Sequence, residues 1–376
     1  MKNHSDILTL RRLLPQVSML KHKALIGLDG FIDEVVHAVD QRIDCKNYTR
    51  IETIAQYGQR ILDSAGLSGN IEIVTVSRKI GGNGAIFASE LLQLGIDVSY
   101  IGSVGVRLHD AVFDILSRTN PAIGIAEPGK TDAIEFKDGK IISSKLDSLN
   151  QMSWADVKRM IPPADFAKRI DAANLVSFNN WTMIPAMSVI WKGIIEEVLP
   201  ITSASFADKK MFIDLADPAK RSDKDICNAL MLLEEFNALG FQVILGLNKK
   251  ECHELLRATG HFNANQVELP LEALVQSVAE CVDISGIVVH PVDKAGVLFN
   301  GVYSEVEGPY CASPAITTGA GDHFNAGFVF GWLNCLPMVQ CLLLGVATSG
   351  FYVRTSISPT IDQLRAFLLD WANLRQ

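Results

Sequence analysis

The chain has 376 residues, of which 48% are hydrophobic and 20% are charged. That balance allows a large buried core and excludes an intrinsically disordered chain. Its 34 Lys and Arg residues are outnumbered by 42 Asp and Glu residues, which gives a net charge of −8. A protein that coats nucleic acid or an anionic membrane normally carries the opposite sign, so we expect neither partner.

The cysteine spacing and the first residues indicate the cellular compartment, and the longest apolar segment bears on a possible membrane span. Seven cysteines are scattered and no pair has C-x-x-C spacing, which favours a reducing compartment over a disulfide framework or a zinc ribbon. The first residues are polar and lack the hydrophobic core of a secretory signal, so a cytoplasmic location is expected. The long apolar stretch at residues 326–353 is interrupted by Asn334, Pro337 and Gln340, and therefore predicts two buried helices rather than a membrane span.

The N-terminal part begins a series of strands and helices. Short apolar runs at residues 24–28 and 71–76 predict strands, residues 85–94 predict a helix, and another apolar run begins at Val98. The pattern suggests strands covered by helices on both faces.

A different pattern follows between residues 121 and 145. Residues 134–144 alternate in polarity around Asp138-Gly139, which is typical of a β-hairpin. A hairpin inserted into a strand–helix series is usually an appendage such as a lid or a dimer surface. We therefore expect a single domain over residues 1–376, with a small β lid that includes roughly residues 121–145, and a homodimer through the lid edge is compatible with this expectation.

From Leu175 onward, short apolar runs alternate regularly with helical stretches. The predicted strands are nearly all apolar, as parallel strands buried on both faces are. They lie at residues 175–178, 211–214, 243–247 and 286–289. This pattern predicts an α/β fold with a doubly wound sheet.

The segment TTGAGDHFNAGF, residues 317–328, carries the strongest indication of chemistry. Gly319, Ala320 and Gly321 are small enough to let a ligand approach the backbone at the start of a helix, where free N–H groups and the helix dipole favour an anion such as a phosphoryl group. Asp322 in the first turn could accept a proton from an attacking hydroxyl. The spacing alone equally supports a core helix whose dipole is complemented by Asp322.

These residues resemble the C-terminal signature of the ribokinase-like (PfkB) family of carbohydrate and nucleoside kinases. GGNGAIFASELLQLG, residues 81–95, is similar to the family's glycine pair and following helix, and residues 248–251 are similar to its N-x-x-E motif. The resemblance implies a three-layer α/β/α sandwich with a mainly parallel central sheet and a small β lid. It also implies transfer of the γ-phosphoryl group of ATP to an alcohol.

The resemblance assigns the transfer step to the late signature. Asp322 would be the general base, and the backbone of Gly319, Ala320 and Gly321 would form an anion hole for the charge on the phosphoryl oxygens. A monovalent cation near the anion hole occurs in parts of the family.

The resemblance also implies nucleotide and metal contacts. The nucleotide is expected to contact Asn248, His290, Gly296 and Thr318. Glu251 would help to hold hydrated Mg²⁺, which keeps several of its waters in proteins. Two alternatives stay open, because Asn248 and Glu251 also have the spacing of a capping box, and His290, at a position where the family usually has Thr, could be a structural histidine.

The substrate is expected to contact three segments. The candidate residues are Asp33, with Asp29 as its alternative, Gly81, Gly82, Asn83 and Asn179. Carboxylate and amide groups bind sugar hydroxyls, and the glycines would let the substrate approach the backbone. Each segment also has a purely structural interpretation. The aspartates could cap a turn, Gly81–Asn83 could form a tight strand-to-helix turn, and Asn179 could be a turn residue. Ile86 departs from the family, which usually has Asn at that position.

Several rival functions remain open. Residues Gly124–Thr131 match the P-loop expression G-x-x-x-x-G-K-[ST], but they lead into the hairpin instead of a helix, so a P-loop NTPase is disfavoured. A non-catalytic sugar or nucleotide sensor would not need Asp322 and Glu251. No cluster of Lys and Arg marks a site for a phosphorylated substrate, which favours a neutral sugar, with a nucleoside as the alternative.

Overall fold

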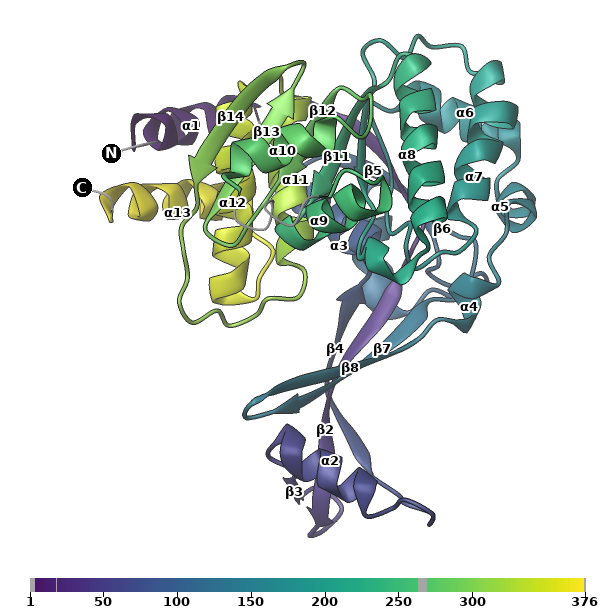
Figure 1. Ribbon diagram of the computed structural model, residues 1–376, viewed down its shortest axis with the longest axis vertical. Helices are drawn as coiled ribbons and strands as arrows, with labels where there is room; N and C mark the ends of the chain where they lie inside the picture. Colours follow the sequence, from purple (N-terminus) through teal and green to yellow (C-terminus); the bar gives the residue numbers. More distant parts are fainter. Residues whose placement is uncertain (1–3, 18, 263–268, 375–376) are drawn as a thin grey trace.

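The computed structural model describes residues 4–17, 19–262 and 269–374, and its main body is built on one large sheet (Figure 1). Within these residues, nine strands follow the order β14-β13-β12-β11-β10-β9-β1-β5-β6. All neighbours from β12 to β6 pair in parallel, and β13 and β14 form an antiparallel extension. The strand bounds are β1 Lys23–Gly27, β5 Asp97–Gly102, β6 Ile123–Gly124, β9 Leu175–Phe178, β10 Lys210–Asp214, β11 Gln242–Leu247, β12 Gly286–Val289, β13 Lys294–Phe299 and β14 Val302–Glu307.

Helices cover both faces of this sheet, because successive strand residues point to opposite faces and both sets are apolar. Leu25 packs into one hydrophobic cluster, and its neighbour Ile26 packs into the other. The first cluster contains α5 Trp154–Met160, α6 Pro163–Ala172, α7 Met187–Gly193, α8 Asp223–Ala238, α9 Lys249–Ala258 and α10 Leu271–Ala279. The second contains α1 His4–Val17, α3 Asn83–Gln93, α11 Ala320–Leu333, α12 Met338–Thr355 and α13 Ile361–Asn373. The expected three-layer α/β/α sandwich is confirmed.

Shorter helical segments connect these elements. They are the one-turn helix α4 Asp147–Asn150, the 3₁₀ segments η1 Ala111–Ser117, η3 Leu199–Ile201 and η4 Pro218–Lys220, and the π-helical segment η2 Ile194–Val198.

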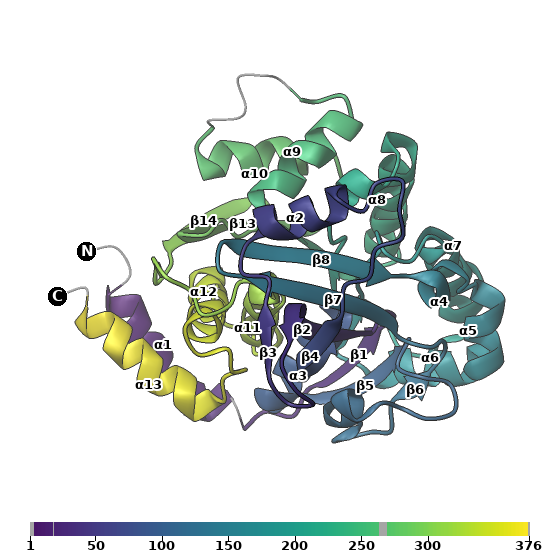
Figure 2. The same ribbon diagram turned by 90° about the horizontal axis from the view of Figure 1, so that it is seen from below.

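A second, smaller sheet projects from the main body (Figures 1 and 2). It consists of β2 Phe31–Arg42, β3 Tyr48–Arg50, β4 Ile73–Gly81, β7 Gly129–Phe136 and β8 Gly139–Lys145, with α2 Ile54–Leu62 near its far end. The expected hairpin is present as β7 and β8.

The small sheet is larger than the hairpin, and one strand prediction is wrong. The run at residues 71–76 was expected to continue the central series, but it leads into β4, which pairs antiparallel with β2 of the small sheet. The reason is visible in the burial of β4, since most of its side chains are exposed and of its apolar side chains only Ile80, near its end, packs partly against a core cluster. The chain passes from the central strand β1 directly into β2 at residues 28–30, at the carboxyl edge of the main sheet.

The long apolar stretch at residues 326–353 forms parts of α11 and α12. The two helices are separated at Asn334–Pro337, where Cys335 has a positive φ of 55° and Pro337 caps α12. Their buried residues belong to the core of the second helical layer. None of the helices in the described ranges has the length and apolarity needed to cross a bilayer.

Candidate active site

The turn before α11 presents backbone N–H groups toward a cavity. Gly319 is the N-cap of α11 with φ 89°, a left-handed conformation that favours glycine. Ala320 and Gly321 open the helix, and both line a cavity of about 280 Å³. Because the first N–H groups of a helix have no intrahelical partner, this turn can bind an anion at the edge of the cavity.

Two stacked rings hold the carbonyl groups of this turn. Tyr352 on α12 donates its hydroxyl to the Thr318 carbonyl at 3.1 Å, and Nδ1 of His323 lies 2.7 Å from the Gly319 carbonyl. The two rings stack with centroids 3.6 Å apart. A carbonyl oxygen can only accept, so Nδ1 of His323 carries the proton. Burial lowers the pKa of His323 to about 4, and Ser358 lies 2.8 Å from its other nitrogen.

Asp322 lies in the first helical turn of α11 and is buried, with 7% of its surface exposed. Burial raises its pKa well above the usual range, and the nearby charges of Asp214, Asp29 and Asp33 raise it further. A hydrogen bond with the side chain of Asn83 acts in the opposite direction. The structure therefore brings Asp322 together with Asn83 and with both candidate substrate carboxylates, Asp29 and Asp33.

Asp29 caps the start of α3 from inside the protein. Its carboxylate accepts from the Gly84 amide at 3.0 Å and from the side-chain amide of Asn180 at 2.6 Å. Burial raises the pKa of Asp29 to about 7, while these bonds lower it. Gly82, with φ 94°, leaves room for this carboxylate, because a Cβ there would lie 2.6 Å from Oδ2 of Asp29. The Asp29 carboxylate is thus bound by groups of the protein itself, and it lies against the backbone of Gly82.

Asp33 lies on β2 of the small sheet and is more accessible than Asp29. It pairs with Lys79 of β4 and Thr131 of β7 in the register of the sheet. Burial raises the pKa of Asp33, and the charge of Lys79 and a hydrogen bond from Thr131 lower it. Its carboxylate covers Gly81, where a Cβ would clash with it. Asp33 therefore places a carboxylate of the small sheet near Asp322 of the main body.

A second group of acids lies at the carboxyl ends of β10 and β11. Asp214 accepts from the side-chain amide of Asn325 on α11 at 2.8 Å. Burial, followed by the charge of Asp214, raises the pKa of Glu251 to about 9. Asn248 and Glu251 form the capping box of α9. The Glu251 side chain accepts from the backbone N–H of Asn248 at 2.9 Å, and the Asn248 side chain accepts from the backbone N–H of Glu251 at 3.0 Å.

These acids suit Mg²⁺ better than a metal ion whose ligands all come from the protein. No cluster of three or more His, Cys, Asp or Glu ligands occurs among the residues that the structure describes. Mg²⁺ usually takes one or two carboxylates and completes its shell with water and substrate phosphates. Asp214 and Glu251 supply two buried carboxylates whose mutual repulsion a cation would relieve.

His290 lines the cavity at the start of α11. Its ring lies 4.7 Å from that of Phe324, and a Cβ at Gly321 would lie 3.2 Å from it. Burial lowers the pKa of His290 to about 4, so it is neutral at neutral pH. The remaining wall is mostly apolar and includes Val292, Pro309, Cys311, Val346 and Val353. A slot with one polar end at the anion-binding turn suits a flat base attached to phosphates.

Three of the expected contact residues do not line this cavity. Gly296 is buried within β13, where a Cβ would meet Tyr303 and Leu271, and it does not line the cavity. Asn179 is buried and its side chain accepts from Ser177 and from the Asp214 amide. Thr318 is exposed and uses its carbonyl to hold Tyr352.

The P-loop match at Gly124–Thr131 has the wrong structure. Gly124 belongs to β6, and Gly129 begins the strand β7. No helix N-terminus follows Lys130, so this segment lacks the helix that cradles phosphates in a P-loop.

Several members of the site were not predicted from the sequence. Lys79 and Asn325 had no expected role, Asn180 was considered only with Asn179 among the asparagines that follow a strand, and Asp29 was only an alternative to Asp33. A signal for two of them existed: Asp29 follows β1 and Asn180 follows β9, and these strands are parallel neighbours whose carboxyl ends meet. Lys79 and Asn325 carried no such signal, because each belongs to a regular strand or helix.

Comparisons with known proteins identify the family and fold of the chain. A family model described as prokaryotic ketohexokinase matches residues 2–371. A ketohexokinase from Haloferax volcanii is 27% identical over 349 residues, which cover 92% of this chain and 90% of that protein. A probable sugar kinase from Rhizobium etli has a similar structure, with a TM-score of 0.63 and 16% identity over 93% of this chain and 98% of its own. Ribokinase from Cryptococcus neoformans in complex with ADP gives a TM-score of 0.59 and 15% identity, over 92% and 99% of the two chains.

Proposed function

The chain belongs to the prokaryotic ketohexokinase family and is a carbohydrate kinase, and from this premise we propose that it transfers the γ-phosphoryl group of ATP to a hydroxyl group of a ketohexose. The observation that carries the proposal is the position of Asp322. This buried acid stands directly after an anion-binding turn and beside Asn83 and Asp33, which can bind hydroxyl groups.

In the proposed mechanism, Asp322 accepts the proton of the attacking hydroxyl. The hydroxyl oxygen forms a bond to the γ-phosphorus, the bond from that phosphorus to the β–γ bridging oxygen breaks, and ADP leaves. A raised pKa makes Asp322 a stronger base than an exposed aspartate, while it still ionises as the pH rises.

The turn before α11 stabilises the transferring group. The N–H groups of Gly319 and Gly321 face the charge on the phosphoryl oxygens, as in other preorganised anion holes. The N–H of Ala320 donates to the Thr317 carbonyl at 3.1 Å and closes the turn. His323 and Tyr352 fix the carbonyl groups of the same turn, so its N–H groups need little reorganisation during transfer.

The acids at the ends of β10 and β11 complete the nucleotide side. Asp214 and Glu251 would hold Mg²⁺ through its waters and the nucleotide phosphates, and the ion would neutralise phosphate charge. The adenine would occupy the slot next to His290 and Phe324.

Product formation tests the proposal. The wild-type protein should release ADP from ATP and Mg²⁺ with fructose, in preference to aldohexoses and adenosine. Asp322→Asn should lower kcat by roughly 2 to 3 orders of magnitude, because the variant cannot accept the proton. Lys130→Ala, at an exposed position within the P-loop match, serves as the control and should retain activity.

The outcomes distinguish the rival functions. Preferential turnover of adenosine would replace the ketohexose by a nucleoside. Sugar and nucleotide binding without ADP release would indicate a sensor. Full activity of Asp322→Asn would exclude it as the base.

A further inference from the structure

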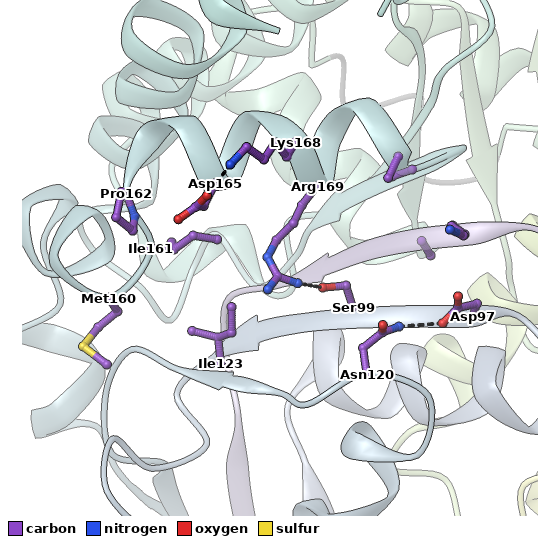
Figure 3. Close-up of a pocket in the computed structure, with 14 residues that line it drawn as sticks. Asp97, Ser99, Asn120, Ile123, Met160, Ile161, Pro162, Asp165, Lys168 and Arg169 are labelled. Carbon is purple, nitrogen blue, oxygen red and sulfur yellow. Dashed lines mark hydrogen bonds and ion pairs between the residues drawn. The ribbon is translucent and has the colours of Figure 1, made fainter. Parts of the chain in front are cut away.

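A second pocket, drawn in Figure 3, lies at the amino ends of the central strands β1 and β5. It has a volume of about 410 Å³, which is within the range of small-molecule sites. Lys23 and Asp97, which begin β1 and β5, lie on its floor, and α6 forms its opposite wall. The carboxyl end of β1 leads to the transfer site, so the two sites are separated by the length of this strand, about 13 Å.

Arg169 reaches from α6 into this pocket, as Figure 3 shows. One of its guanidinium nitrogens donates to Oγ of Ser99 on β5 at 2.6 Å. The side chain is partly buried, and among the described residues no carboxylate lies within ion-pair distance of it. A guanidinium group has five N–H donors, so most of its hydrogen-bonding capacity is open.

The two acids of the pocket have partners of their own. Asp97 accepts from the side-chain amide of Asn120 at 2.6 Å. Asp165 accepts from Lys168 at 2.9 Å, and both residues line the pocket. A partly buried cation without a counter-charge is costly, and an anion that binds Arg169 would relieve this cost.

The wall next to Arg169 is apolar. Ile123, Met160 and Ile161 line the pocket on the side where the guanidinium group points (Figure 3). A ligand that fits both surfaces has a charged head and a short hydrocarbon body. Three cations and two acids line the pocket, which gives the lining a formal charge of +1; they are Lys23, Lys168, Arg169, Asp97 and Asp165. A carboxylate balances this charge and matches the guanidinium fork, whereas a doubly charged head such as phosphate would exceed it.

We propose that this pocket is a binding site for a small monocarboxylate, with its carboxylate on Arg169 and its hydrocarbon body against Ile123, Met160 and Ile161. The site is separate from the proposed sugar and nucleotide sites and does not depend on the identity of the kinase substrate.

Calorimetric titration of the wild-type protein with acetate, propionate and butyrate tests the hydrocarbon contact. Affinity should rise about three- to fourfold with each added CH₂ group as it is buried. Butylamine, with the same hydrocarbon length and the opposite charge, should not bind. Equal affinity for acetate and butyrate, tighter binding of inorganic phosphate than of butyrate, or binding of butylamine would each overturn the proposal.

Matched variants test the charge contact. Arg169→Met keeps most of the side-chain length and should weaken butyrate binding at least about tenfold, because charge-assisted hydrogen bonds are lost. Lys192→Met removes the same charge from an exposed residue of α7 that does not line the pocket, and should leave the affinity within about twofold. Arg169→Lys retains the charge without the fork and should be intermediate, so it provides a second measurement if Arg169→Met does not fold. Equal butyrate affinity in wild type and a folded Arg169 variant would contradict the assignment.

Discussion

Carboxylates surround Asp322, and their charges decide at which pH it can act as a base. Burial is the largest cause of its raised pKa, and the charge of Asp214 is the next. The positive charge of Lys79 lowers the pKa of the neighbouring Asp33. The proposed base therefore keeps its proton to a higher pH than an exposed aspartate would.

This environment predicts an acid limb in the pH profile of kcat that lies above the usual aspartate range. As pH falls, Asp322 gains its proton and kcat falls, so activity is present above its raised pKa and lost below it. Asp214→Asn removes the largest neighbouring charge and should move the limb to lower pH. Steady-state rates from pH 4 upward would measure both.

In Asp214→Asn the new amide has a hydrogen-bond partner, and rates measured at saturating Mg²⁺ separate the pH effect from weaker binding of the proposed ion. Oδ1 of Asn325 is buried without a hydrogen bond, and rotation of the Asn325 amide would let it accept from the new amide group. A limb that stays at the same pH in Asp214→Asn would contradict the proposed electrostatic coupling.

The turn before α11 is held by Tyr352 of α12, the helix that follows α11 after a short loop. Tyr352→Phe keeps the ring stacked on His323 but deletes the bond to the Thr318 carbonyl. We expect a loss of about 1 kcal/mol in the free energy of unfolding and a severalfold lower kcat, with the KM for the sugar nearly unchanged. Denaturant unfolding and steady-state kinetics would measure these effects. A rise in the KM for sugar with unchanged kcat would contradict a role confined to the anion-binding turn.

The start of α3 gives a second prediction for an element. Asp29→Asn would place an amide group against the side-chain amide of Asn180, so a buried donor would face a donor. The variant should lose about 1 to 3 kcal/mol of unfolding free energy. Adding Asn180→Asp exchanges donor and acceptor and should recover much of the loss, since position 180, with φ 62°, tolerates Asp as it does Asn. Denaturant unfolding of the two single variants and the double variant would measure the coupling, and purely additive losses would contradict it.

Local motifs made some of these positions predictable and left others hidden. The turn and Asp322 are contiguous in sequence, and the alternating runs of the central strands are local as well. The cap of α3 joins Asp29 to Gly84 and Asn180, which are 55 and 151 residues away along the chain. Likewise, β4 has the alternation of a strand, but only its pairing with β2 assigns it to the small sheet.

For the whole molecule, the small sheet is joined to the body at the transfer site. β2 starts immediately after the end of β1 and carries Asp33, while β4 leads directly into α3 and Asn83. Substrate that contacts Asp33 and Asn83 would therefore touch both the small sheet and the main body. Such a ligand couples the position of the lid to the occupancy of the site.

This coupling predicts a substrate-dependent gain in stability that requires Asp33. Saturating fructose, at about 100 times its Kd, should add roughly 2.7 kcal/mol of apparent stability in the wild-type protein. Asp33→Asn should lose most of the sugar-induced rise in Tm and retain the rise that ATP produces, because the nucleotide slot lies against His290 and Phe324. Glu34→Gln changes the next residue of β2, which points to the other face of the sheet, and should respond to both ligands as the wild type does. Thermal unfolding with each ligand separately would measure the shifts, and an unchanged sugar response in Asp33→Asn would leave the substrate to be held by the main body alone.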